Sequence, residues 1–170
     1  MHPTQIVVFA FGAASIVGTL LLLLPFATAP GNSTSVVAAF FTAVSAVCIT
    51  GLTVVDTATH WSGFGQLVIM VLIQLGGLGI VSFATLLGLL ISGRISLRDR
   101  INTLSEAKIV GADSLPKLLS RILIVYFGFE LVLATYLSLR LHFSYGESVF
   151  QSIWHGTFHA ISAFNNGGFS

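Results

Sequence analysis

Charged residues are scarce in this chain. Lysine, arginine, aspartate and glutamate together make up 8% of its 170 residues, while 55% are hydrophobic; a soluble domain carries about 25% charged residues. So little charge cannot cover a globule of this size in water, which excludes a soluble enzyme and a nucleic-acid-binding protein. Disorder requires low hydrophobicity, so a disordered tail is excluded as well. The composition predicts an integral membrane protein.

Cysteine is almost absent. Cys48 is the only one, which excludes an internal disulfide and a cysteine-based zinc or iron–sulfur site. His155 and His159 remain as a candidate metal pair, because i, i+4 spacing places them on one helix face. We expect no carboxylate to complete a coordination set there. Packing and hydrogen bonding are therefore the main interpretation of this pair, and a membrane metalloenzyme is an alternative.

Two long apolar runs, residues 6–27 and 64–91, contain no ionisable residue. With a rise of about 1.5 Å per residue, each is longer as a helix than the roughly 30 Å hydrocarbon core, which predicts two membrane spans. Residues 118–141 form a third predicted span, with one acidic residue, Glu130. A signal peptide is the alternative for the first run, because Ala-Thr-Ala at 27–29 is typical of a cleavage site, although no lysine or arginine precedes it.

Two further apolar segments, residues 36–48 and 148–164, are too short to span a bilayer. Asn32, Ser33 and Thr34 are N-cap candidates for the first of them. An uncharged half-length helix between two spans predicts a re-entrant pore helix, and an amphipathic surface helix is the alternative. The predicted order is span, half-helix, span, loop, span, half-helix.

Positive charges set the predicted orientation. No lysine or arginine precedes Arg94, and all but Arg140 fall within or beside the loop at 93–117. The positive-inside rule places this loop and the amino terminus in the cytoplasm, so both half-helices enter from the opposite side. Docking of a cytoplasmic partner is a second interpretation of the loop. Its basic residues, with those beside it, are Arg94, Arg98, Arg100, Lys108, Lys117 and Arg121.

The two half-helices are internal repeats. A shift of 117 positions aligns Phe41-Thr42-Ala43-Val44-Ser45-Ala46 with Phe158-His159-Ala160-Ile161-Ser162-Ala163, and Gly51 with Gly168.

An irregular, glycine-containing segment follows each helix, and such backbone is tolerated at membrane depth only where it is buried in protein or lines a watery cavity. Carbonyls there can replace the hydration shell of a cation, and the helix carboxyl ends reinforce them. The predicted filter residues are Cys48, Ile49, Thr50 and Gly51, with Asn165, Asn166, Gly167 and Gly168. Glycines that only allow close helix packing are the alternative.

Three stretches carry a family resemblance: Thr50-Gly51-Leu52 with Val54-Val55-Asp56-Thr57 after it, Leu72-Ile73-Gln74-Leu75-Gly76-Gly77-Leu78-Gly79, and residues 158–169. Together they resemble the Trk/Ktr/HKT superfamily of potassium transporters. This resemblance implies a fold of four span–pore-loop–span units around one filter, with Gly51 and Gly168 as filter glycines and glycine at the first position associated with potassium preference. This chain would then be an all-α piece of a longer transporter, with one complete unit at 1–92, a cytoplasmic basic loop at 93–117 and an incomplete unit at 118–170.

The same resemblance implies the transported ion, the location and the partners of the longer protein. We expect potassium (K+) uptake across the bacterial cytoplasmic membrane, with sodium (Na+) as an activator and no organic cofactor. The expected partners are membrane lipid, a second copy of the full-length subunit and a cytoplasmic nucleotide-binding regulatory ring. The chain is not expected to be an enzyme. A non-conducting membrane scaffold stays open as the alternative.

Two carboxylates have candidate roles beside the filter. Asp56, five positions after Gly51, would lie at the outer mouth, where a negative charge concentrates cations; capping of the next segment is equally open. Glu130 lies roughly mid-membrane, where a carboxylate is costly and suggests function. We expect its partner to be a backbone amide or a hydroxyl on a neighbouring helix, with no filter segment facing it. An ion-binding or gating role is the alternative.

Overall fold

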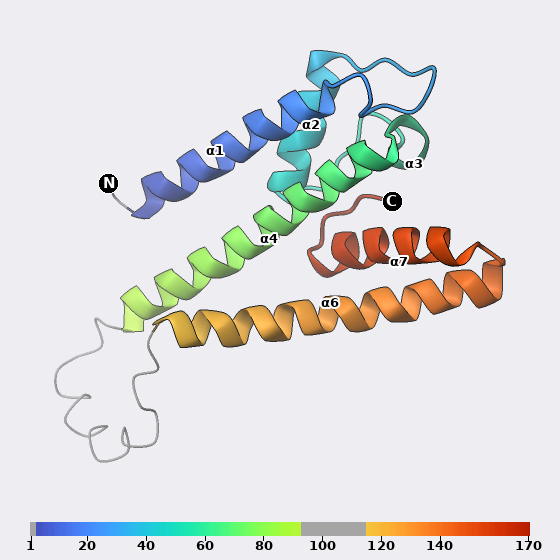
Figure 1. The fold of residues 1–170 in the computed structure, drawn as a ribbon. Coiled ribbons are helices and arrows are strands. Elements are labelled where there is room, and N and C mark those ends of the chain that lie inside the picture. The colour runs from blue at the N-terminus through green and yellow to red at the C-terminus, as the bar shows by residue number, and fades with distance from the viewer. Residues whose placement is uncertain (1–2, 93–114) are drawn as a thin grey trace, which may run out of the picture. The chain divides into compact units, whose positions relative to one another are not determined.

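The computed structural model describes residues 3–92 and 115–170, and the regular structure in these ranges is helical (Figure 1). Two compact units share the chain. One joins the residues up to Gly79 with Glu130–Ser170, and the other comprises Ile80–Phe129. Both candidate filter segments lie in the first unit, which is described below. The predicted loop at 93–117 falls almost entirely outside the described residues, so its cytoplasmic placement stays a prediction.

Helix α1, Pro3–Leu22, ends five residues before the predicted end of the first span at Ala27. A last helical bond joins Leu23 N to Thr19 O at 3.0 Å, and tighter turns follow. The cause is Pro25, because a proline disfavours helical backbone at the residue before it and cannot donate a hydrogen bond itself.

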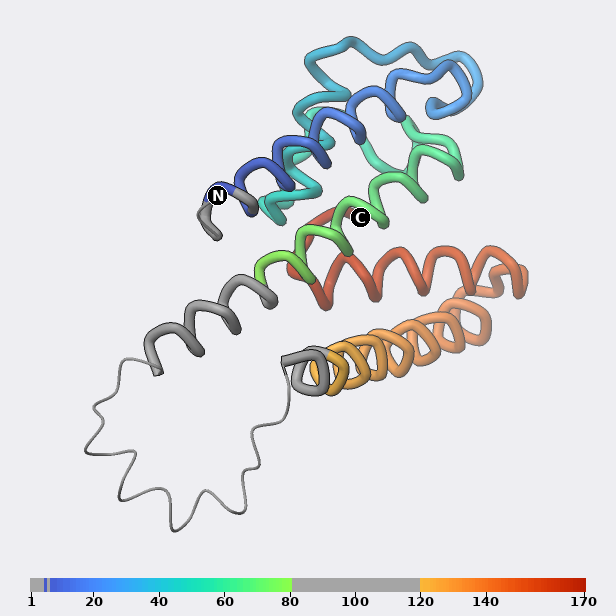
Figure 2. The backbone as a smooth tube through the Cα atoms, turned by 60° about the vertical axis from the view of Figure 1, so that its left-hand side comes forward, coloured from blue at the N-terminus to red at the C-terminus, as the bar shows by residue number. Residues whose placement is uncertain are grey.

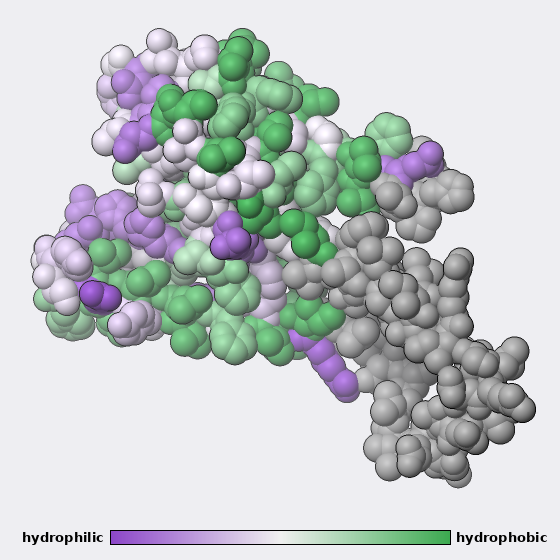
Figure 3. Space-filling model, turned by 180° about the vertical axis from the view of Figure 1, so that it is seen from behind, coloured by the Kyte–Doolittle hydropathy of each residue, from purple (hydrophilic) through white to green (hydrophobic). Residues whose placement is uncertain are grey.

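Helices α4, Gly63–Ser92, and α6, Leu115–Tyr145, form where the second and third spans were predicted. Among the described residues, two stretches are long and apolar enough to cross a membrane, Gly63–Ile80 and Ser120–Tyr145. Only 11% of the second stretch is buried within the chain. Hydrophobic side chains accordingly cover much of the surface of the described helices (Figure 3), as expected for contact with lipid or other membrane segments.

Helices α2, Val36–Val47, and α7, Val149–Phe164, are the two short elements. The 12 residues of α2 give about 18 Å, which falls well short of a bilayer core. Ser148 is the N-cap of α7, and Ser35 is the N-cap of α2, where its Oγ accepts from Ala38 N at 3.1 Å. The N-cap prediction for residues 32–34 was therefore wrong.

Thr34 and Asn32 are engaged elsewhere. The Thr34 hydroxyl meets the His60 ring, and Asn32 Nδ2 donates to Thr59 O at 3.1 Å. His60 and Thr59 belong to the single-turn helix α3, Thr57–His60. These bonds connect the loop before α2 to α3, so Ser35 is left to cap α2.

Small residues let the helices of this unit approach closely. A Cβ added at Gly76 of α4 would lie 2.2 Å from Val47 O at the end of α2, and one at Gly156 of α7 would lie 2.2 Å from Ser138 Oγ of α6. The buried core between these helices includes Ile69 and Ile73. The chain after α7 folds back beside α4 (Figure 2), and Phe169 at its end is buried in the same core.

Candidate functional site

Helices α2 and α7 end in the same backbone geometry. Their C-caps are Cys48, at φ −85° and ψ −1°, and Asn165, at φ −81° and ψ 0°; each cap amide donates to the carbonyl four residues earlier, at 2.8 and 3.1 Å. The next residues, Ile49 and Asn166, are left-handed with φ of 56° and 59°. Left-handed backbone is uncommon outside glycine, and for a β-branched isoleucine it is an outlier. The repeat in the sequence is thus also a repeat in conformation.

The two glycines predicted to form the filter lie against each other. Gly51 and Gly168 have φ of 71° and 70°. A Cβ added at Gly51 would lie 3.0 Å from Gly168 Cα, and one added at Gly168 would lie 2.7 Å from Gly51 Cα. Both the positive φ and the close contact therefore require glycine at these positions.

A serine in the last turns of each short helix holds the segment that follows. Ser45 Oγ donates to Leu52 O at 2.7 Å, and Ser162 Oγ donates to Phe169 O at 2.6 Å. The backbone carbonyl of each serine accepts from the amide five residues later, at 3.0 and 2.6 Å. The sequence repeat identified both serines as equivalent but not this role, which depends on how the chain folds back.

Within residues 3–92 and 115–170, the carbonyls of residues 48–51 and 166–168 accept no hydrogen bond. Both segments also follow helix carboxyl ends, where the helix dipole is negative. Free carbonyls beside helix carboxyl ends are groups that can coordinate a desolvated monovalent cation.

Glu130 lies in contact with one of the predicted filter residues. Its Oε1 accepts from Asn165 Nδ2 at 2.9 Å, and its Oε2 accepts from Gln74 Nε2 at 2.7 Å. The side chain of Glu130 is buried, with 6% of the residue exposed. The expectations of a backbone or hydroxyl partner, and of no filter segment at this position, were both wrong. The side-chain amides come from α4 and from the end of α7.

The role of Gln74 was missed from the sequence. It stands within the motif at 72–79 that carries the family resemblance, but no role was predicted for its side chain from the sequence. The predicted span at 64–91 holds two amide side chains, Gln66 and Gln74, and the chain has one mid-membrane carboxylate, so a bond between an amide and Glu130 was the available signal. Which of the other helices brought a partner to Glu130 could not be read from spacing.

Asp56 is the N-cap of α3. Its Oδ1 accepts from Thr59 Oγ1 at 2.8 Å and from Thr59 N at 2.9 Å. These bonds, the hydroxyl first, hold the pKa of the exposed Asp56 carboxyl below its usual range. The capping role is therefore present, and the carboxylate stays ionised at neutral pH. Its place at an outer mouth remains a prediction.

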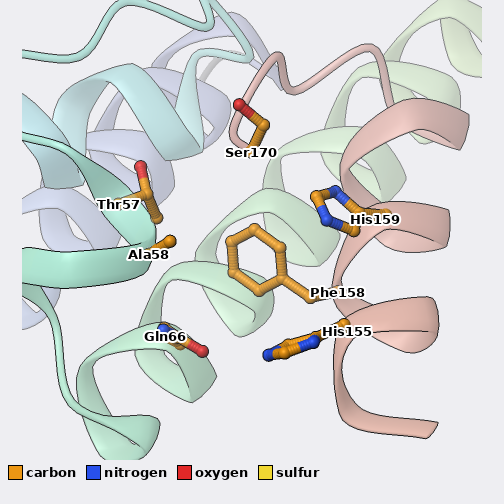
Figure 4. Close-up of a pocket in the computed structure, with 7 residues that line it drawn as sticks. All are labelled: Thr57, Ala58, Gln66, His155, Phe158, His159 and Ser170. Carbon is orange, nitrogen blue, oxygen red and sulfur yellow. The ribbon is translucent and has the colours of Figure 1, made fainter. Parts of the chain in front are cut away.

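The histidine pair has a carboxylate neighbour that the sequence interpretation did not expect. His155 Nδ1 lies 3.0 Å from Glu147 Oε2. Both histidines line a small cavity of about 60 Å³, where side chains of α7 face those of α3 and the start of α4 (Figure 4). In the part of the chain that the structure describes, no group of three or more histidine, cysteine, aspartate or glutamate side chains could hold a metal ion. The cavity is lined by Thr57, Ala58, Gln66, His155, Phe158, His159 and Ser170.

Comparison with known proteins places the chain in a family. The family model described as TrkH, cation transport protein, matches residues 1–170. The chain is 42% identical to the Ktr system potassium uptake protein B of Bacillus subtilis, 36% identical to the potassium/sodium uptake protein NtpJ of Enterococcus hirae and 34% identical to the Ktr system potassium uptake protein D of Bacillus subtilis. Each match covers 99% of this chain and 37% of the relative, so the chain spans about 37% of the length of these curated relatives.

Proposed function

Because the chain belongs to the TrkH family of cation transport proteins, we propose that it helps to form the ion pathway of a potassium uptake protein. Residues 48–51 and 165–168 are the filter segments in this proposal. Their backbone carbonyls replace water around a K+ ion, and their helix carboxyl ends stabilise its charge. No side chain acts as a ligand, which suits segments without a carboxylate.

One observation carries the proposal. The segments after α2 and α7 repeat the same backbone conformation and bring Gly51 and Gly168 into contact, with a Cβ at either position 3.0 Å or less from the other Cα. Glycines that served only helix packing would lie within helices and would need no positive φ. Two matching left-handed glycines outside the helices support a common role as filter glycines.

The longer protein is proposed on the same basis. We infer a transporter of four span–pore-loop–span units, with residues 1–92 as the first unit and 118–170 as part of the second. The proposed location is a bacterial cytoplasmic membrane, crossed several times, with the amino terminus inside. A homodimer, a cytoplasmic nucleotide-binding ring and activation by Na+ belong to this proposal and rest on the family resemblance.

The proposal is tested with Gly51→Ser and Gly168→Ser in the full-length protein. A side chain in left-handed backbone costs about 1–2 kcal/mol, so we expect K+ uptake at low external K+ to fall by about tenfold or more. The preference for K+ over Na+ should fall with it. Uptake of K+, rubidium and Na+ is measured in a host that lacks its own potassium transporters.

Gly31→Ser is the matched control. Gly31 also has a positive φ of 87°, but a Cβ there meets nothing within 4 Å and the residue lies outside both segments. Its substitution carries the same backbone strain and should leave selectivity unchanged. If Gly51→Ser and Gly168→Ser also leave uptake and selectivity unchanged, the filter proposal fails and a packing scaffold is favoured.

A further inference from the structure

We propose that Glu130, together with Gln74, is a positioning residue for the second filter segment and acts through the side chain of Asn165. This proposal rests on the proposed function, because it assigns a role within the same ion pathway. Glu130 touches no ion in this account. It fixes the residue from which the second filter segment begins.

The three side chains form a closed triangle. Asn165 Nδ2 donates to Glu130 Oε1 at 2.9 Å, Gln74 Nε2 donates to Glu130 Oε2 at 2.7 Å, and Asn165 Nδ2 lies 3.2 Å from Gln74 Oε1. Each residue comes from a different element, α6, α4 and the cap of α7. The triangle therefore ties the end of the second short helix to two long helices.

The Asn165 amide also separates two negative groups. Its Nδ2 donates to Ile161 O, a carbonyl in the last turn of α7, at 2.9 Å as well as to Glu130. Without that amide, the carboxylate would face the negative end of the α7 dipole directly. Burying a carboxylate is costly unless hydrogen-bond donors satisfy it. Glu130 therefore needs the Asn165 amide as a donor, and this requirement holds the Asn165 side chain in one orientation.

In the part of the chain that the structure describes, the first short helix has no such arrangement. At the equivalent cap, Cys48 has nearly the same backbone angles, but its side chain is exposed, whereas Asn165 is 8% exposed. The cap geometry alone therefore does not require the triangle. A buried carboxylate placed at one of two equivalent caps points to control of that segment in particular.

An exchange of the two helix partners tests this. Gln74→Glu alone places two carboxylates together, and Glu130→Gln alone turns an amide donor toward another donor. The double variant Gln74→Glu/Glu130→Gln restores a compatible arrangement: residue 130 donates to residue 74, and the Asn165 amide again faces an acceptor oxygen on each. In full-length protein we expect each single variant to raise KM for K+ by about tenfold and to reduce the preference for K+ over Na+. The double variant should return both values to within about threefold of the parent.

Asn165→Cys gives the second cap the side chain found at the first, and it removes the amide without adding charge. It should shift KM and selectivity in the same direction as the single variants. Thr135→Ala on α6 is the control, because Thr135 Oγ1 donates only within its own helix, to Leu131 O at 2.7 Å. It should change neither value.

The outcomes separate this proposal from the filter proposal. If the variants lower only the amount of protein in the membrane, with KM and selectivity unchanged for the protein that remains, the triangle is structural and the positioning role is overturned. A double variant no better than its singles overturns it too. Gly51→Ser and Gly168→Ser are measured beside them, and if these alone change selectivity, the filter proposal stands without the positioning role.

Discussion

At the scale of single residues, Ser45 and Ser162 show how few side chains are needed to shape an irregular segment. Each hydroxyl donates to a carbonyl seven residues later, at 2.7 and 2.6 Å, and each serine is buried. The bond closes the loop that contains the left-handed residues. An isoleucine in left-handed backbone is costly, and such strain persists only where the surroundings determine the conformation.

We expect Ser162→Ala to lower K+ affinity. Loss of the hydroxyl leaves the buried Phe169 carbonyl without its donor, which costs about 1–3 kcal/mol. Ser45→Ala should act in the same way on the first segment, and Ser162→Thr, which keeps a hydroxyl, should retain uptake. KM for rubidium uptake by the full-length protein measures the effect.

Ser15→Ala is the control for these variants. Ser15 Oγ donates at 2.8 Å to Phe11 O within α1, far along the chain from either segment. Removing a hydroxyl there should leave KM unchanged. An unchanged KM in Ser45→Ala and Ser162→Ala as well would mean that the two serines do not shape the ion site.

At the scale of elements, one of the two closest approaches joins α4 to the end of α2. A Cβ at Gly76 would lie 2.2 Å from Val47 O, which is backbone and cannot move aside cheaply. Gly76→Ala should therefore destabilise the full-length protein by about 1–3 kcal/mol through overpacking. Thermal unfolding in detergent measures this, with Gly12→Ala as the control, because a Cβ at Gly12 meets nothing within 4 Å. Equal midpoints for the two variants would contradict the close contact.

Elements with strong local signals were predictable from the sequence. Long apolar runs predicted α4 and α6, and the short apolar segment predicted at 148–164 matches α7 to within a residue. The end of α1 was placed too late, because hydrophobicity continues past Leu22 while Pro25 ends the helix. The cap of α2 was misplaced, because Thr34 and Asn32 bond to residues of the α3 turn that no local pattern reveals.

The site was predictable only in part, for a related reason. The repeat aligned Gly51 with Gly168, but their contact depends on how the two segments pack. Glu130 was expected to lie away from the filter, yet it bonds to Asn165. Contacts between distant helices depend on the rotation of each helix about its axis and on its depth in the membrane. A helix that is hydrophobic all round has no periodic pattern from which either could be predicted.

At the scale of the whole molecule, the proposed ion pathway requires one orientation in the membrane. The basic residues after α4 predict that the amino terminus is cytoplasmic and that the turns at α3 and between α6 and α7 face outward. Single cysteines introduced into full-length protein carrying Cys48→Ala test this. Ala58→Cys and Ser144→Cys, both at exposed positions, should react with a membrane-impermeant maleimide in intact cells, whereas Gln5→Cys should react only in inside-out vesicles.

The expected labelling pattern follows from the length of the two short helices. Short helices of 12 and 16 residues cannot cross the bilayer, so the chain before and after each must lie toward the same side. Ala58 follows α2 and Ser144 precedes α7, so both report the side from which these helices enter. Each variant should also react fully after solubilisation in detergent. This control shows that a thiol protected in cells is shielded by the membrane and not buried within the protein. Labelling of Gln5→Cys in intact cells, with Ala58→Cys protected, would invert the topology and leave the two filter segments opening toward the cytoplasm.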